Sequence, residues 1–175
     1  MRYDLLTILA VYLGFALMEI VRSGFFKKPE QRGKDAVVEL VSTVTLVGLT
    51  QPMVYLTAFM AMRWAFPGAE NMLSGLPIIA QVALLLVCDD MVQYGWHRLS
   101  HSVPWLYALH RPHHDARYMS VRIVYRNNLF YYALMPNLWL SGILIYMGLG
   151  WVYAFYGVVK MTVIIAAHSD VRWDA

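Results

Sequence analysis

The sequence has few charged residues and almost no cysteine. Only 14% of its 175 residues are Asp, Glu, Lys or Arg, whereas a soluble domain carries about a quarter. At 59% hydrophobic residues, the chain lacks the polar side chains that would cover a soluble globule, and it is too apolar to be disordered. The single cysteine, Cys88, excludes an internal disulfide. This composition predicts an all-α, multi-pass transmembrane helical bundle.

Long apolar runs mark the predicted spans. A membrane helix needs roughly 20 apolar residues, and residues 5–21, residues 36–62 and a run starting at residue 76 meet this requirement. The stretch 129–167 is long enough to cross twice, with a reversal at Gly148-Leu149-Gly150 and a helix break at Pro136-Asn137. We also expect Pro52 to kink the second span, because proline interrupts the helical hydrogen-bond ladder.

Basic residues indicate which ends of the spans face the cytoplasm. Lys and Arg gather in residues 22–34 and in residues 98–126, and short loops rich in these residues stay on the cytoplasmic side. The net charge of +3 forms no basic patch of a soluble module, so no nucleic-acid partner is expected. On this topology all six histidines lie at the cytoplasmic face: His97, His101, His110, His113, His114 and His168.

The histidine spacing predicts a metal site. His97 and His101 are four residues apart, so they share one face of a helix. His110 is followed three and four residues later by His113 and His114, so His110 and either of these two can point to one place. Neutral imidazole is the commonest metal ligand in proteins. A nitrogen-rich set suits Fe, Zn, Cu or Ni rather than Mg or Ca. The alternative is that these histidines have ordinary structural roles. The clustering of five of them disfavours this alternative, which fits His168 better.

Two carboxylates precede this cluster. Asp90 lies seven residues before His97, two helical turns away, and Asp89 is its neighbour. A carboxylate near the membrane needs a partner. We therefore predict that Asp90 accepts the distal N–H of a metal-binding histidine and so supports catalysis. There are two alternatives for these aspartates. They could bind the metal directly, or they could lie at a helix end and reach water.

These motifs resemble the fatty acid hydroxylase/sterol desaturase superfamily of membrane di-iron oxygenases. The boxes HxxxH and HxxHH of that superfamily match residues 97–101 and 110–114, and residues 168–172 (His-Ser-Asp-Val-Arg) resemble its later His-Ser-Asn-x-Arg segment. The resemblance divides the chain into N-terminal transmembrane helices, residues 1–75, and a hydroxylase-like domain, residues 76–175. A further HxxHH cluster of the family is missing before Ala175, so we expect this domain to be truncated at its C-terminus.

The resemblance implies an oxidoreductase that hydroxylates or desaturates a C–H bond of a sterol or fatty acyl lipid with O₂. Its cofactor would be two iron ions, for which zinc can substitute, held by the six histidines. Its partners would be the lipid bilayer, a lipid substrate, O₂ and a cytoplasmic electron donor. The choice of lipid, and the choice between hydroxylation and desaturation, remain open at this point.

Two other functions fit a membrane histidine cluster. A metal-binding membrane protein or scaffold without catalysis would use the same ligands on an incomplete site. A membrane zinc hydrolase would need a general-base glutamate beside a ligand, as in H-E-x-x-H. Arg98 and Arg111 follow the leading histidines here, which disfavours the hydrolase.

Overall fold

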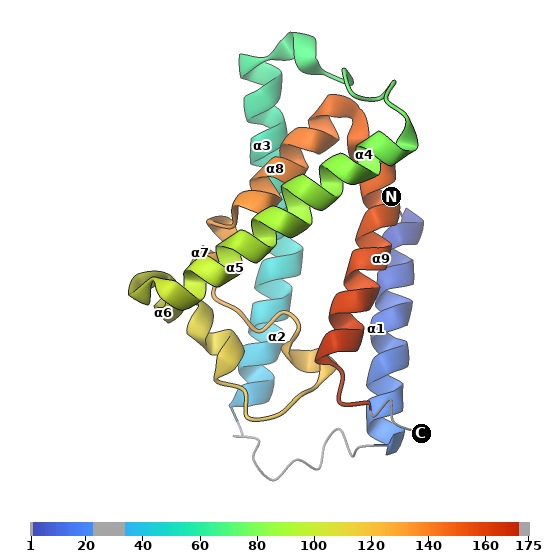
Figure 1. Ribbon diagram of the computed structural model, residues 1–175. Helices are drawn as coiled ribbons and strands as arrows, with labels where there is room; N and C mark the ends of the chain where they lie inside the picture. Colours follow the sequence, from blue (N-terminus) through green and yellow to red (C-terminus); the bar gives the residue numbers. More distant parts are fainter. Residues whose placement is uncertain (1, 23–33, 172–175) are drawn as a thin grey trace.

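The computed structural model describes residues 2–22 and 34–171, and the secondary structure in these two ranges is entirely helical (Figure 1). The helices of the first half are α1 (Arg2–Arg22), α2 (Asp35–Thr45), η1 (Leu46–Thr50), α3 (Gln51–Ala65), η2 (Pro67–Ala69), α4 (Ile78–Leu85) and η3 (Leu86–Met91). Those of the second half are α5 (Val92–Ser102), α6 (Pro104–His114), η4 (Val121–Ile123), α7 (Leu129–Ala133), α8 (Pro136–Leu144), η5 (Ile145–Leu149) and α9 (Gly150–His168).

Four helical stretches are long and apolar enough to cross a membrane: Leu5–Arg22, Asp35–Ala65, Ile78–Ser102 and Pro136–His168. Their outer faces carry exposed leucine, valine and isoleucine side chains, among them Leu13, Leu40 and Ile79. Such faces are expected where hydrocarbon rather than water surrounds the helices. The predicted all-α fold with several membrane-spanning helices is confirmed.

The fourth stretch folds back on itself at Gly148. This residue has φ 105°, a left-handed conformation that glycine adopts without steric cost. A Cβ at Gly148 would also lie 3.0 Å from Asn71 Cα. The loop between α3 and α4, which contains Asn71, therefore packs closely against the turn at Gly148. The predicted reversal is therefore confirmed, and α8 and α9 form the two arms of a hairpin (Figure 1).

The first arm of the hairpin is short. α7 ends at Ala133, Met135 is extended, and α8 begins at Pro136, which confirms the predicted break. At 1.5 Å per residue, residues 136–147 cover about 18 Å, well below the roughly 30 Å of a bilayer core. α9 covers about 28 Å by the same rise. Of the two predicted crossings, α9 is long enough to span most of the bilayer core. The other, α8 with η5, is too short by itself and is separated from α7 by a break.

The distortion near Pro52 takes the form of a π-helical turn. The turn η1 ends at Thr50, and Pro52 occupies the first turn of α3. A proline ring inside a regular helix would clash with the carbonyl four residues before it. The wider π-helical turn directly precedes the proline, and the helix then continues to Ala65.

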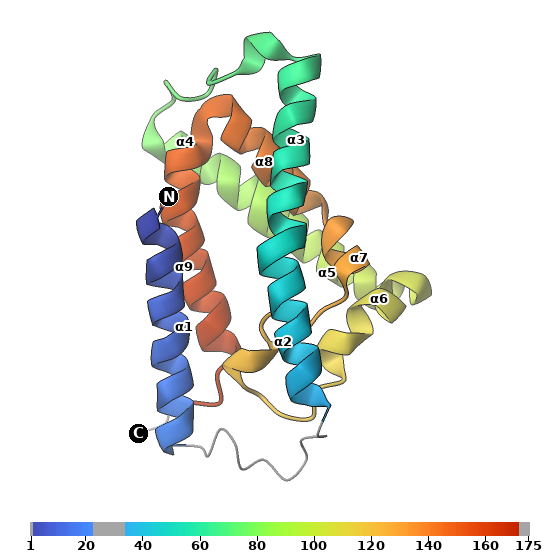
Figure 2. The ribbon, with the colours of Figure 1, turned by 180° about the vertical axis from the view of Figure 1, so that it is seen from behind.

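Close packing joins the hairpin to the rest of the bundle. α8 lies against α3, and α9 lies against α1 (Figure 2). At the α3–α8 contact, a Cβ on Gly142 would come within 2.7 Å of Ala58 Cβ and 3.2 Å of the Tyr55 backbone. Small residues allow membrane helices to approach this closely, where the hydrophobic effect contributes little to helix association.

Gly142→Ala is therefore expected to separate α3 from α8 and to lower the free energy of unfolding by about 1–3 kcal/mol, as overpacking does. Gly157→Ala on α9 is the matched control, because nothing lies within 4 Å of its new Cβ. Thermal unfolding of both variants in detergent, followed by circular dichroism, measures the difference. Equal melting temperatures for the two variants would show that the α3–α8 contact is not tight.

Candidate metal centre

A sharp corner places the two histidine-bearing helices side by side. α5 ends at Ser102, Val103 is extended, and Pro104 begins α6. A residue before proline is driven out of the helical region, and proline is favoured in the first turn of the next helix. This dipeptide therefore ends one helix and starts the other, and α6 packs back against α5.

The corner brings together four of the predicted ligands. One ring nitrogen from each of His97, His101, His110 and His114 lies within 4.8 Å of the other three. His97 Nε2 is 3.1 Å from His101 Nε2, and His110 Nε2 is 3.0 Å from His114 Nε2. His110 is buried while the other three are exposed, so the cluster opens to the surroundings on one side.

The two remaining histidines form a second pair. His113 Nε2, on α6, lies 3.4 Å from His168 Nε2, at the end of α9. His168 Nδ1 lies 2.8 Å from the Ile164 carbonyl oxygen, a contact that holds the proton on Nδ1 and leaves the Nε2 lone pair free. The His113 ring stacks on the His110 ring at 5.4 Å between centroids, so the pair adjoins the group of four.

These separations fit metal binding. A metal ion binds imidazole nitrogen at about 2.0–2.1 Å, so neighbouring nitrogen ligands of one ion lie about 2.9–3.4 Å apart. All three Nε2 pairs fall within this range. An N–H···N hydrogen bond between two histidines gives similar distances. Three neighbouring histidine pairs nevertheless provide enough nitrogen ligands to hold a metal ion.

Burial keeps the α6 histidines neutral. Burial, together with the neighbouring His97 and His113, lowers the pKa of His110 to about 3. Burial, followed by the nearby His168, lowers the pKa of His113 to about 4. Both rings are therefore uncharged at neutral pH, and neutral imidazole is the form that binds metal.

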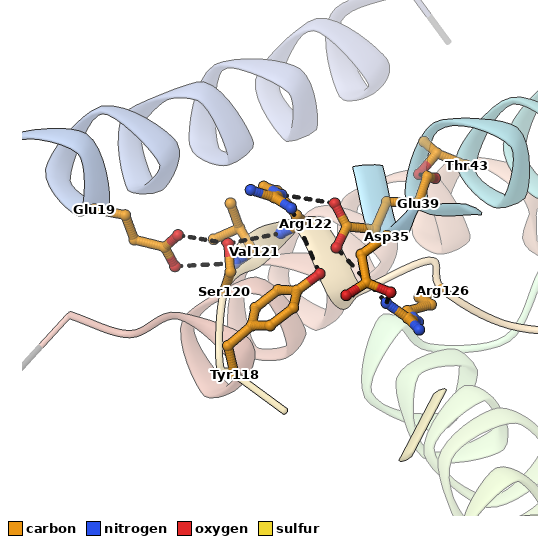
Figure 3. A network of polar contacts seen from close by, with 9 residues as sticks. All are labelled: Glu19, Asp35, Glu39, Thr43, Tyr118, Ser120, Val121, Arg122 and Arg126. Atoms are coloured by element: carbon orange, nitrogen blue, oxygen red, sulfur yellow. Dashed lines mark hydrogen bonds and ion pairs between the residues drawn. The ribbon is translucent and has the colours of Figure 1, made fainter. Parts of the chain in front are cut away.

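An arginine caps the helix that carries His110, His113 and His114. Arg126 Nε donates to the Pro112 carbonyl oxygen at 2.9 Å, and its Nη1 lies 3.0 Å from Asp35 Oδ1. The last carbonyls of a helix have no intrahelical partner. The arginine satisfies one of them and ties the end of α6 to α2. Beside it, Arg122 donates to Glu39 at 2.7 Å (Figure 3).

A buried glutamate ties α1 to the segments next to both histidine groups. Glu19 is 1% exposed. Its carboxylate accepts hydrogen bonds from Ser120 Oγ at 2.7 Å and from the backbone N–H of Val121 and of Asp170 at 2.9 Å. Asp170 follows His168 by two residues, so Glu19 fixes the chain just after α9. Figure 3 shows the contacts of Glu19 with Ser120 and Val121. The histidine motifs gave no indication of the roles of Glu19 and Glu39, although an acid inside an apolar run indicates a buried partner.

Asp90 was predicted to accept a hydrogen bond from a histidine, but in the structure it contacts Lys160 instead. Its Oδ1 lies 3.1 Å from Lys160 Nζ on α9, and no hydrogen bond to a histidine ring is found in the described ranges. Lys160 also contacts Asp89 Oδ2 at 2.7 Å, and Asn137 Nδ2 donates to Asp89 Oδ1 at 2.8 Å. A lysine inside the bundle needs a counter-charge, and the two aspartates of η3 supply it.

A comparison with family models identifies the chain. The model of the family described as Fatty acid hydroxylase matches residues 82–175, more than half of the 175 residues and all of the histidines. The chain belongs to the fatty acid hydroxylase family, as its histidine motifs predicted. It is an integral membrane protein with a hydroxylase domain. No curated protein and no solved structure matches it.

Arg126→Met is expected to lower the free energy of unfolding by about 3 kcal/mol, because it removes a buried guanidinium that contacts Asp35 and Glu39 of α2 and donates to the Pro112 carbonyl of α6. The control is Arg111→Met, which removes an exposed arginine 3.4 Å from Asp115 and should cost less than about 1 kcal/mol. Thermal unfolding in detergent measures both. A loss for Arg126→Met as small as that of the control would contradict a stabilising role for the cap.

Proposed function

We propose that the protein is an O₂-dependent oxidoreductase that hydroxylates or desaturates a membrane lipid with two non-haem iron ions. The single observation that carries the proposal is the convergence of ring nitrogens from α5, α6 and α9. In this proposal His97, His101, His110, His113, His114 and His168 bind the metal. Membership of the fatty acid hydroxylase family supports the lipid and the oxygenase chemistry.

The proposed chemistry requires a redox metal. An alkyl C–H bond carries no acidic proton and no developing charge that a protein side chain could stabilise, so the oxidising power must come from a cofactor and O₂. The side chains of this protein would hold the iron on neutral nitrogen donors and leave room beside the exposed rings of His97, His101 and His114. A lipid could then reach them sideways from the bilayer.

The proposed partners are a lipid and a cytoplasmic electron donor. Arg98, Arg111 and Arg117 are exposed on the segments around the histidine cluster. Arg122 and Arg126 instead form buried ion pairs with Glu39 and Asp35. The three exposed arginines would therefore meet an acidic donor, and complementary charge accelerates such encounters. We place this face on the cytoplasmic side, in line with the basic loops.

A zinc hydrolase is less well supported. Within the described part of the chain, the group of four potential ligands contains only histidines. A hydrolase also needs a carboxylate or another general base beside the metal to take a proton from water. Asp89 and Asp90, which precede the first histidine pair in the sequence, contact Lys160 instead.

His110→Ala and His113→Ala are expected to remove most of the bound iron, because each takes one nitrogen from a shared set of ligands. Elemental analysis of protein purified in detergent measures the iron per chain. The control is Trp105→Ala, which removes a side chain 59% exposed on the same helix and should keep its iron. Unchanged iron in both histidine variants would disprove the ligand assignment.

The metal dependence of turnover separates an oxygenase from a hydrolase. We expect the iron-loaded protein, given a chemical reductant and membrane lipid, to consume O₂ and to yield a hydroxylated or unsaturated lipid detectable by mass spectrometry. The zinc-loaded protein should bind its metal and consume no O₂, because zinc has no redox chemistry. Hydrolysed lipid from the zinc form, with no oxidised lipid from the iron form, would favour the hydrolase.

A further inference from the structure

The imidazole of His110 lies at the centre of the histidine groups. Its ring centroid is 4.7 Å from those of His97 and His114, and 5.4 Å from those of His101 and His113. The side chain is also buried, at 2% exposed. His110 therefore adjoins both the group of four and the second pair, so a rotation of this one ring would disturb both sets of proposed ligands.

A histidine side chain does not fix the plane of its own ring. Rotation about the Cβ–Cγ bond has a broad, roughly two-fold energy profile, whereas a metal ligand must be held to within about 0.5 Å and 10–20°. The packing around the ring must therefore supply the missing restraint. At one edge of the His110 ring, Asn127 Nδ2 lies 3.5 Å from Nδ1, a distance at the outer limit of a hydrogen bond.

Tyr131 of α7 covers the face of the same ring. The phenol and the His110 imidazole are stacked, with 4.5 Å between their centroids and 22° between their planes. This is the shortest of the ring separations found around His110 in the described part of the chain. A flat ring that lies against the imidazole opposes its rotation out of the stacked plane, which an aliphatic side chain of similar volume would not do.

Tyr131 is itself held from several sides. It is 2% exposed and belongs to a hydrophobic cluster that includes side chains of α3 and α8. Its hydroxyl lies 3.3 Å from Oγ of Ser100, a fully buried residue that directly precedes His101 on α5. The Trp96 ring of the same helix lies 5.8 Å away. Tyr131 thus contacts α5, which carries the first histidine pair, and His110 on α6.

We propose that Tyr131 is a positioning residue of the metal centre, whose ring sets the plane of the His110 imidazole and so the arrangement of the ligands around the metal. The inference rests on the proposed function, because it requires that His110 binds the metal. A tyrosine that only filled space in the core would affect the stability of the fold and leave the geometry of the bound metal unchanged.

The test is titration of the full chain, purified in detergent, with Co²⁺, whose visible d–d absorption bands depend on the ligands and their geometry. Tyr131→Leu and Tyr131→Met remove the aromatic ring. We expect each to weaken Co²⁺ binding about 10- to 100-fold, as loss of an outer partner of a metal-binding histidine does, and to shift the d–d bands. Two replacements of different shape are used in case one of them does not fold, which circular dichroism shows.

Tyr131→Phe keeps the ring and removes only the hydroxyl contact with Ser100. It should therefore bind Co²⁺ within about 3-fold of the wild type, as expected for the loss of one long hydrogen bond between neutral groups, and with the same d–d bands. A shift of the bands in Tyr131→Phe as large as in Tyr131→Leu would contradict the role of the stacked ring.

Tyr132→Leu is the matched control. Tyr132 is the next residue of α7 and packs against the same hydrophobic cluster, and in the described ranges its ring contacts that of Tyr131 and no histidine ring. This variant should lower the melting temperature, as loss of a core side chain does, and leave both the Co²⁺ affinity and the bands unchanged. Equal shifts of the bands in Tyr132→Leu and Tyr131→Leu would reduce Tyr131 to a packing residue.

The same titration separates this inference from the proposed function. If the wild type binds no Co²⁺, the metal centre itself is disproved, and the proposed function with it. If the wild type binds Co²⁺ and folded Tyr131→Leu or Tyr131→Met binds it with the same affinity and the same bands, the positioning role of Tyr131 alone is disproved.

Discussion

A charge surrounded by hydrocarbon must be paired, and this requirement organises the polar side chains of the bundle. Burying an unpaired ion costs several kcal/mol, so buried charges are found with partners. The buried acids Glu39 and Asp89 each have a basic partner, Arg122 and Lys160. Glu19 has no such cation in its described contacts and is instead satisfied by three hydrogen-bond donors. Each pairing joins segments that are distant in the sequence.

These pairings also hold the histidines in place. Arg126 caps α6 directly behind His113 and His114, and it is held in turn by Asp35 of α2. Glu19 fixes the chain two residues after His168. A metal site needs its ligands held to within a fraction of an ångström. Here α1 and α2, which carry no histidine, contribute that support to a cluster built from α5, α6 and α9.

The polar groups around Asp90 share one cation. Lys160 of α9 contacts both Asp90 and the better-buried Asp89, and Asn137 of α8 donates a hydrogen bond to Asp89. These contacts join both arms of the hairpin to η3, the turn that precedes the helix carrying His97 and His101. The carboxylates therefore position the first histidine pair through the backbone rather than by direct contact with a ring.

Much of this architecture could be predicted from the sequence, because it depends on local rules. Span positions follow from apolar length, the reversal at Gly148 from glycine, the break before α8 from Pro136, and the two histidine boxes from helical spacing. Other features depend on residues far apart in the chain. Lys160 lies 71 residues after Asp89, and Arg126 lies 91 after Asp35, so no local pattern links them.

The sequence by itself thus determined an all-helical membrane protein with six clustered histidines and its membership of the fatty acid hydroxylase family. Only the tertiary structure decided that Asp90 pairs with Lys160 rather than with a histidine. It also decided that His168 meets His113 and that Glu19 and Arg126 support them. The physical reason is that helix formation and membrane insertion depend on neighbouring residues, whereas the partner of a buried charge depends on how whole helices pack.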